Sequence, residues 1–411
     1  MVPDLTRRRA LVAAGSVAGI GHLSPPAVAE QSRANPPDTG PPDGNEWPME
    51  RRDPAGTGYA PDASGPKDGV RVRWKQPVEA NLGFFYGVTP IVSDGLVYGV
   101  DRELVCVDAA SGEVVFRVDR EYVNPPAVAP ARAYEHPTLV FDSRRGVDGL
   151  DARGGIALAG LRLGLRRWSI ERDQGLATTI LGGQDHSVPV AAGDSVFVTT
   201  GDSLLAIDAS SGRVRWRRPG GGYRPAVRDG TVYVASYARG LLGYDVESGE
   251  RIFSPDDVQS PLSVTAAPER LVVRCHRPIV GVDYDGSVAW RKGPEEFWGR
   301  GAIAAANGVA YTAGVDEENS LVAIDVSDGT TLWTSSMEPE QTPQSAPPSV
   351  ADGVVYVPED DAGLAAVDAE DGHVRWRFDP GEDPTRWSPA ALVGETLYAL
   401  ADGHLYALEE A

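Results

Sequence analysis

The side chains that most often carry chemistry are sparse in this sequence of 411 residues, and they stand far apart. No histidine after the first 29 residues has another histidine at metal-ligand spacing. These histidines are His136, His186, His276, His373 and His404. The chain also lacks a G-x-S-x-G elbow and a phosphate-binding glycine loop. The sequence therefore predicts no catalytic residue and no metal site, since the serines of DASSG (208–212) belong to a recurring turn.

The two cysteines and the acidic loops offer little more chemistry. Cys106 stands at the position that Ala206 holds in a similar segment, which favours a small buried hydrophobic side chain. A disulfide to Cys275 is not expected, because the repeats described below place the two residues on opposite sides of the molecule. The acidic stretches at 254–258 and 358–363 suit calcium in type, but they are more typical of solvated loops.

The net charge of −21 and the near absence of lysine describe an unusual surface. Only Lys67, Lys75 and Lys292 occur, so almost all positive charge is arginine. At molar salt the Debye length falls to about 3 Å and self-repulsion is mostly screened. We interpret the composition as salt adaptation, against the alternative of an acidic protein from ordinary salt. Such a surface argues against a nucleic-acid partner, whose phosphates it would repel.

The N-terminus has the pattern of an export signal. TRRRAL (6–11) precedes the apolar run at 10–23, which is short for a membrane span, and AVA (27–29) is a small-x-small cleavage site. The arginines resemble those of the twin-arginine route, although Ala10 stands where a bulky apolar residue is usual. We expect cleavage after Ala29, no later membrane span, and an extracellular or cell-surface protein. A Pro/Gly-rich linker (30–46) and a lead-in segment (47–70) would follow.

A repeated hairpin organises the rest of the chain. LLAIDASSGRVRW (204–216) returns as LVAIDVSDGTTLW (321–333) and LAAVDAEDGHVRW (364–376). Its aspartate recurs mostly every 37 to 43 residues, with one longer interval around an insertion at 154–168. The positions are Asp108, Asp151, Asp208, Asp245, Asp283, Asp325 and Asp368, with Glu409 in an eighth copy. Units of about 40 residues with four short strands and no helix are typical of propeller blades.

The eighth copy lacks its tryptophan strand, and the N-terminal part of the chain supplies a match. VRVRWKQP (70–77) resembles GRVRWRRP (212–219). We therefore predict an all-β fold with eight four-stranded blades over 71–411, closed by this N-terminal strand, because closure leaves no sheet edge unpaired. One aromatic side chain per blade should dock structurally against a neighbouring unit. These are Trp74, Phe116, Trp168, Trp216, Phe253, Trp290, Trp333 and Trp376.

The motif A-x-D-x-x-[ST]-G-x-x-x-W, present as AIDASSGRVRW (206–216), resembles the tryptophan-docking motif of pyrroloquinoline-quinone-type (PQQ-like) eight-bladed propellers. The lead-in WPMERRDPAGTGYAPDASGP (47–66) resembles that of exported non-catalytic members. The resemblance implies one of two branches: quinone-dependent dehydrogenases, or binding scaffolds such as the assembly lipoprotein BamB. The dehydrogenases carry adjacent cysteines and calcium ligands, and no adjacent cysteines occur here. The resemblance therefore favours the scaffold branch, with no cofactor predicted and PQQ with calcium as the alternative.

The loops before the innermost strands gather at one mouth of a propeller channel, and here they carry aromatic and basic residues. These residues are candidates for a ligand or partner rim, because such side chains are enriched at binding hot spots. They are Phe85, Tyr86, His186, Tyr223, Arg224, Trp298, Arg300, Arg386 and Trp387. The alternative is that they plug the channel mouth and pair with local aspartates.

Three functions remain open from the sequence. The first is a non-enzymatic, monomeric propeller that binds an unknown protein or extracellular ligand. The second is a PQQ-dependent dehydrogenase with an atypical site. The third is a polysaccharide- or solute-binding module that uses the rim. Fold alone does not separate them.

Overall fold

The computed structural model describes residues 42, 44–78, 88–100, 103–119, 122, 124–143, 146–158, 161–171, 188–293, 301–313, 320–335, 346–359, 363–379, 381 and 387–411. All of them belong to the unit Pro37–Ala411, and the fold below is the fold of that unit. Every regular element in the described ranges is a β-strand. The predicted all-β class is therefore confirmed.

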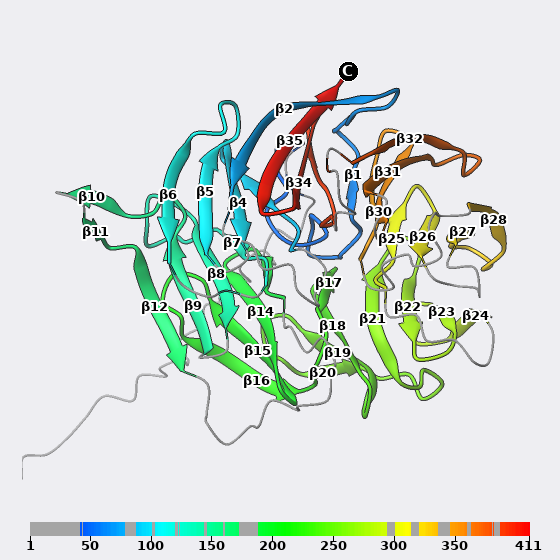
Figure 1. Cartoon of the computed structure of the whole chain (residues 1–411). Helices are drawn as coiled ribbons and strands as arrows, with labels where there is room; N and C mark the ends of the chain where they lie inside the picture. The colour runs from blue at the N-terminus through cyan, green and yellow to red at the C-terminus, as the bar shows by residue number, and fades with distance from the viewer. Residues whose placement is uncertain are drawn as a thin grey trace, which may run out of the picture. The chain divides into compact units, whose positions relative to one another are not determined.

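Eight antiparallel sheets form the blades, and Figure 1 shows them fanning out in sequence. Blade 1 contains β3 (Ile91–Ser93), β4 (Leu96–Val100), β5 (Leu104–Asp108) and β6 (Val114–Val118). Blade 2 contains β7 (Ala127–Ala129), β8 (Thr138–Ser143), β9 (Gly146–Asp151) and β12 (Arg166–Glu171). Blade 3 contains β13 (Val190–Ala192), β14 (Ser195–Thr200), β15 (Ser203–Asp208) and β16 (Val214–Pro219). Blade 4 contains β17 (Ala226–Arg228), β18 (Thr231–Ser236), β19 (Gly240–Asp245) and β20 (Arg251–Phe253).

The second half of the ring repeats this order. Blade 5 contains β21 (Pro261–Ala266), β22 (Leu271–Cys275), β23 (Ile279–Val282) and β24 (Val288–Lys292). Blade 6 contains β25 (Ala304–Ala306), β26 (Val309–Ala313), β27 (Leu321–Asp325) and β28 (Thr331–Ser335). Blade 7 contains β29 (Ser349–Ala351), β30 (Val354–Glu359), β31 (Gly363–Asp368) and β32 (Val374–Phe378). Blade 8 contains β33 (Ala391–Val393), β34 (Thr396–Ala401) and β35 (His404–Glu410), together with β2 (Val70–Pro77).

Three short strands lie outside this scheme. β1 (Tyr59–Ala60) adds to β29 of blade 7 in parallel. β10 (Ile156–Leu158) and β11 (Leu161–Leu163) form a separate hairpin between β9 and β12 of blade 2, within the insertion seen in the sequence. First strands of neighbouring blades contact one another, as β13 does with β7 and β17, so these strands line the axis of the ring.

The burial pattern of the strands follows from stacking one blade on the next. The middle strands are apolar on both faces, as in β14 (SVFVTT), because each blade face is covered by a neighbouring blade. The outer strands alternate, as in β16 (VRWRRP), where Trp216 is buried between exposed arginines. Several tight turns inside the blades use Asp-Gly or Asn-Gly pairs with positive φ at both residues, such as Asp229 and Gly230. That is the turn that these pairs predict.

The ring closes as the sequence predicts. β2 pairs antiparallel with β35, with Val70 opposite Glu410 and Pro77 opposite His404, and Figure 1 shows the two strands side by side. The first and last strands of the ring therefore share one sheet, and the edge of β35 is paired.

Each docking tryptophan links its blade to the next one. The indole nitrogen donates to the carbonyl oxygen of the residue after the next hairpin aspartate, at 2.9 to 3.1 Å. The donor and acceptor pairs are Trp74 with Ala109, Trp168 with Ala209, Trp216 with Val246, Trp290 with Val326, and Trp333 with Ala369. Trp376 instead donates to Pro66 at 3.2 Å, so the lead-in supplies the acceptor that the shortened last hairpin lacks.

The hairpin glycine does more than relieve backbone strain. Gly212 has φ +71°, and a Cβ at this position would lie 2.6 Å from the Trp168 ring. Gly112 stands in the same relation to Trp74, and Gly249 to Trp216. The glycine is therefore required both by its φ and by the close approach of the ring from the preceding blade.

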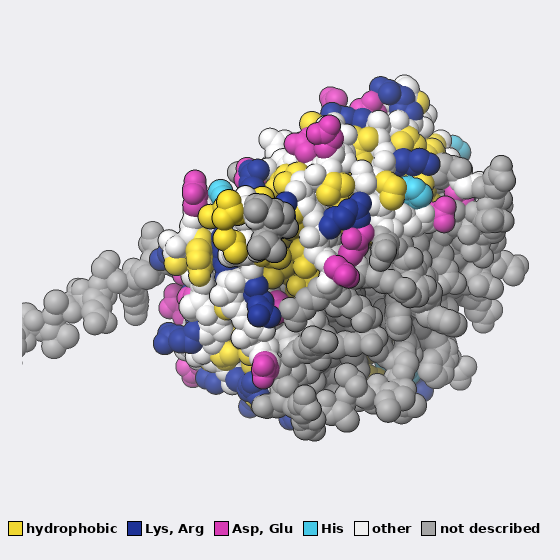
Figure 2. All heavy atoms as spheres, turned by 60° about the vertical axis from the view of Figure 1, so that its left-hand side comes forward, with side chains coloured by type: hydrophobic (Ala, Val, Ile, Leu, Met, Phe, Trp, Pro, Cys, Tyr) yellow, Lys and Arg dark blue, Asp and Glu magenta, His cyan; other side chains and the backbone are white. Residues whose placement is uncertain are grey.

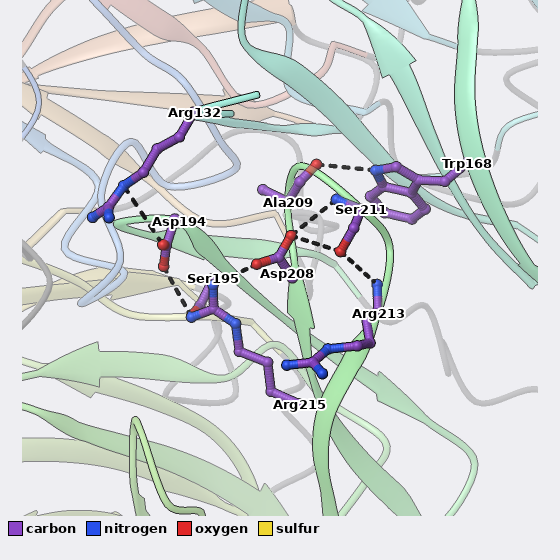
Figure 3. A network of polar contacts seen from close by, with 9 residues as sticks. All are labelled: Arg132, Trp168, Asp194, Ser195, Asp208, Ala209, Ser211, Arg213 and Arg215. Carbon is purple, nitrogen blue, oxygen red and sulfur yellow. Dashed lines mark hydrogen bonds and ion pairs between the residues drawn. The ribbon is translucent and has the colours of Figure 1, made fainter. Parts of the chain in front are cut away.

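The hairpin aspartate orders the turn that receives the ring (Figure 3). Asp208 Oδ1 accepts hydrogen bonds from the Ser211 amide at 2.9 Å and from its hydroxyl at 2.8 Å. Its Oδ2 accepts from Arg215 Nη2 at 2.7 Å, while Arg215 Nη1 lies 2.9 Å from Asp194. These contacts explain why aspartate, a small residue and glycine recur at fixed spacing.

Both cysteines are buried and free. Cys106 lies in blade 1 and Cys275 in blade 5, on opposite sides of the ring, as expected from the repeats. Burial raises the pKa of each thiol to about 12.

Candidate functional site

The lead-in segment lines the inner edge of the ring. Residues 47–58 accept or exchange backbone hydrogen bonds with the first strands of blades 1, 2, 4, 5, 6 and 7. The strand residues that donate are Val92, Val128, Val227, Ala266, Ala305 and Val350. Without the lead-in segment, the backbone N–H groups of these six residues would have no protein hydrogen-bond partner. The chain therefore satisfies the axis-facing edge of six blades with its own N-terminal residues.

Arg224, a predicted rim residue, holds this segment in place. It precedes β17, its residue is 8% exposed, and its guanidinium donates to the carbonyl oxygens of Glu50 at 2.8 Å and Asp53 at 2.7 Å. Its Nε lies 3.5 Å from the Glu50 carboxylate. Burial lowers the pKa of Arg224, and the carboxylates of Glu50 and Asp53 partly offset this effect. Arg224 thus faces the carboxylate of a glutamate in the distant lead-in, and not one of the local aspartates that the alternative named.

Arg51 of the lead-in is a second buried arginine at this place. Its guanidinium donates to the Thr265 hydroxyl in blade 5 and to the carbonyl oxygen of Ile303, which precedes blade 6. Burial, and then the nearby charge of Arg224, lower the pKa of Arg51 to about 9. The two guanidiniums converge on Gly56, where a Cβ would lie 2.6 Å from Arg224 Nη1 and 3.3 Å from Arg51 Cζ.

Two of the other rim candidates lie in the described residues. Tyr223 is half-buried, and its carbonyl oxygen accepts a hydrogen bond from Thr199 at 3.0 Å. Trp387 is 1% exposed and packs between blades 7 and 8, with ring centroids 5.7 Å from Phe378 and 5.1 Å from Tyr406. Of the three described candidates, only Tyr223 keeps appreciable exposed surface for a ligand.

The remaining rim candidates lie outside the described residues. They are Phe85, Tyr86, His186, Trp298, Arg300 and Arg386. The hypothesis of a ligand or partner rim stays a prediction for these positions.

Sequence reasoning did not assign a role to the buried arginines of the lead-in. Arg51 and Arg52 both have positive φ and are at most 3% exposed. The sequence contained one sign of a structural role, because the two adjacent arginines stand between Glu50 and Asp53 in the lead-in. Nothing in their spacing shows that Arg51 reaches two blades more than 200 residues away, because only ring closure brings these parts together.

The described residues do not fit the quinone site that the dehydrogenase branch implies. That site needs adjacent cysteines, whereas Cys106 and Cys275 lie in different blades. In the described ranges, no three His, Cys, Asp or Glu side chains are grouped to hold a metal ion.

The same ranges contain no helix long and apolar enough to cross a membrane.

Comparisons with known proteins agree with this fold. A search of the curated proteins finds no match. The BamB structure from Moraxella catarrhalis is 15% identical, with 83% of this chain and 98% of that chain covered at a TM-score of 0.61. The quinohemoprotein alcohol dehydrogenase of Comamonas testosteroni is 12% identical, with 89% and 80% covered at a TM-score of 0.65. A europium-containing methanol dehydrogenase is 12% identical, with 89% and 98% covered at a TM-score of 0.59.

These structural likenesses show the eight-bladed fold alone, because it is shared by a scaffold and by dehydrogenases. The sequence match to a family model is more specific and covers residues 162–283 and 276–411, which is more than half of the chain. The protein therefore belongs to the family described as outer membrane protein assembly factor BamB, whose PQQ-like repeats build its blades.

Proposed function

We propose that this chain is an exported, non-catalytic propeller that binds a protein partner or an extracellular ligand through the loop face of the ring. Membership in the BamB family supports a scaffold role. The observation that carries the proposal is the pairing of residues 47–58 with the inner strands of six blades. The edge that faces the axis is already bonded to the chain itself, which favours the loop face for partners.

The quinone dehydrogenase alternative has a direct test. The protein is titrated with pyrroloquinoline quinone and calcium, followed by absorbance and calorimetry, together with a dye-linked alcohol oxidation assay. The proposal expects neither saturable binding nor turnover. Saturable binding with turnover would contradict the proposal and make the ring an enzyme.

A second experiment addresses the loop face. A photo-crosslinking amino acid replaces Trp298 or Arg386 in two rim variants, and Ile252 of β20 in a control, because Ile252 is 56% exposed on an outer strand. Crosslinking in source cells should give one discrete adduct from the rim positions and none from the control. Identical adduct patterns from rim and control positions would count against a binding face.

A further inference from the structure

The β10–β11 hairpin presents an apolar face to solvent. Ile156 is paired with Leu163 across the hairpin, and Leu158 lies two residues along the same strand from Ile156. Side chains at such positions share one face of a two-stranded sheet. The three residues are 71%, 51% and 61% exposed in the order Ile156, Leu163 and Leu158, which is unusual for aliphatic side chains so close together.

The opposite face of the hairpin is fixed to blade 1 by Arg162. Arg162 is paired with Ala157, so its side chain leaves the hairpin on the other face. Its guanidinium lies 5.0 Å from the centre of the Phe116 ring and donates to the Val115 carbonyl oxygen at 2.6 Å. It also donates to the Gly154 carbonyl oxygen at 3.1 Å. The hairpin is therefore held on β6 with its apolar face turned outward.

Two glycines fix the backbone conformation at the start of the hairpin. Gly154 has φ +80°, and a Cβ there would lie 2.6 Å from the Phe116 ring and 2.8 Å from Arg162 Nη1. A Cβ at Gly155 would lie 2.3 Å from the Leu163 carbonyl oxygen. Two consecutive glycines thus allow the chain to leave blade 2 and fold back onto blade 1.

The charge around this hairpin differs from that of the whole chain. Residues 152–170 contain four arginines and no aspartate or glutamate, in a chain whose net charge is −21. Arg153 pairs with Asp94 and Arg167 with Asp151 from flanking elements, while Arg166 is exposed. Figure 2 shows this side of the molecule, where hydrophobic side chains lie among basic and acidic ones.

We propose that the β10–β11 hairpin is a membrane-docking element that inserts Ile156, Leu158 and Leu163 into the surface of an anionic lipid bilayer. Aliphatic side chains beside arginine complement acyl chains beside phosphate headgroups. The charge far from the hairpin does not oppose this contact strongly, because the Debye length is about 8 Å at physiological salt and about 3 Å at molar salt. The proposal is independent of what the loop face of the ring binds.

A second copy of the chain fits this surface less well. A stable protein interface buries about 800 Å² per partner, and three aliphatic side chains supply only a small part of that area. A bilayer has no comparable area requirement, since each apolar side chain enters it separately.

The test uses co-sedimentation of the full chain with vesicles of equal parts phosphatidylglycerol and phosphatidylcholine. The double variant Ile156→Asp with Leu158→Asp should weaken partitioning by about a hundredfold, roughly tenfold per aliphatic side chain removed. The matched controls are Ile252→Asp and Leu332→Asp on outer strands, where the original residues are 56% and 50% exposed. These controls should bind as the unaltered protein does. Arg166→Glu should weaken binding to these vesicles but not to vesicles of phosphatidylcholine alone.

A position-specific readout separates the hairpin from the apolar run at 10–23, which all variants share. An environment-sensitive dye is attached to Leu158→Cys or to the control Ile252→Cys, since the native thiols are buried. Vesicles should shift the dye emission to the blue at position 158 and leave it unchanged at position 252. Equal shifts at the two positions, equal binding of hairpin and control variants, or dimers that the hairpin substitutions dissociate would each overturn the proposal.

Discussion

The indole Nε1 of Trp168 donates a hydrogen bond to the carbonyl oxygen of Ala209, 2.9 Å away, and this contact joins blade 2 to blade 3 (Figure 3). The ring also covers Gly212 of the same turn. The turn and the tryptophan of the preceding blade therefore form one packing unit, which recurs around the propeller.

Gly212→Ala should destabilise the protein more than Gly230→Ala. Both glycines have positive φ, +71° and +74°, so the backbone strain is similar. A Cβ at 212 would lie 2.6 Å from the Trp168 ring, whereas a Cβ at 230 would have nothing within 4 Å. We expect an additional loss of about 1–3 kcal/mol at 212, measured by denaturant unfolding. Equal losses at the two positions would show that the ring yields at no cost.

Trp216→Ala should reduce the free energy of unfolding by about 3–5 kcal/mol, because it removes a buried ring and leaves a cavity between blades 3 and 4. The substitution also removes a hydrogen bond, because the Trp216 indole nitrogen donates to the Val246 carbonyl oxygen at 3.0 Å in the unaltered protein. Leu332→Ala on the outer strand β28 is the control and should change stability by less than about 0.5 kcal/mol. An unchanged melting temperature for Trp216→Ala would argue against docking.

Deletion of residues 70–77 should open the ring and abolish single-step unfolding. β35 would lose its partner strand, and the deletion would also remove Trp74, which donates to Ala109 of blade 1. Calorimetry should show a broadened transition at lower temperature. The deletion variant and its reference both begin at Pro42, the first described residue, and the reference keeps residues 70–77. If the deletion variant melts as cooperatively as this reference, strand closure does not hold the ring together.

Acid should weaken the hairpin turns. Backbone and side-chain hydrogen bonds from Ser248 lower the pKa of Asp245 below its ordinary value of 3.8. A group with a depressed folded-state pKa stabilises the fold above its unfolded pKa, and this contribution is lost as the pH falls through the folded-state value. The stability difference between the unaltered protein and Asp245→Asn should therefore be largest above pH 4 and shrink below it.

Urea unfolding at several pH values measures that difference. The exposed Asp257 gives the control substitution Asp257→Asn, which removes a carboxylate outside any hairpin turn. A pH-independent difference for Asp245→Asn would mean that its carboxylate charge contributes nothing to the turn.

The sequence by itself determined the repeat, the blade count and the closing strand. Each blade is built from contacts within about 40 residues, so its hairpin aspartate, glycine and tryptophan are visible as a periodic pattern. The match of 70–77 to 212–219 was sufficient to predict the pairing of β2 with β35. The absence of a disulfide between Cys106 and Cys275 also followed from their positions in the repeat, as did the burial of Cys106.

Only the tertiary structure decided what the non-repeated residues do. The sequence makes Arg224 a candidate for the ligand or partner rim. In the structure its guanidinium donates hydrogen bonds to the carbonyl oxygens of Glu50 and Asp53 in the lead-in, more than 170 residues away. The sequence likewise predicts Trp387 in a rim loop, but its side chain is buried between Phe378 and Tyr406. Contacts of this kind occur once per molecule, so they leave no periodic pattern in the sequence. The Arg224 contacts exist because the lead-in runs along the inner strands of the ring.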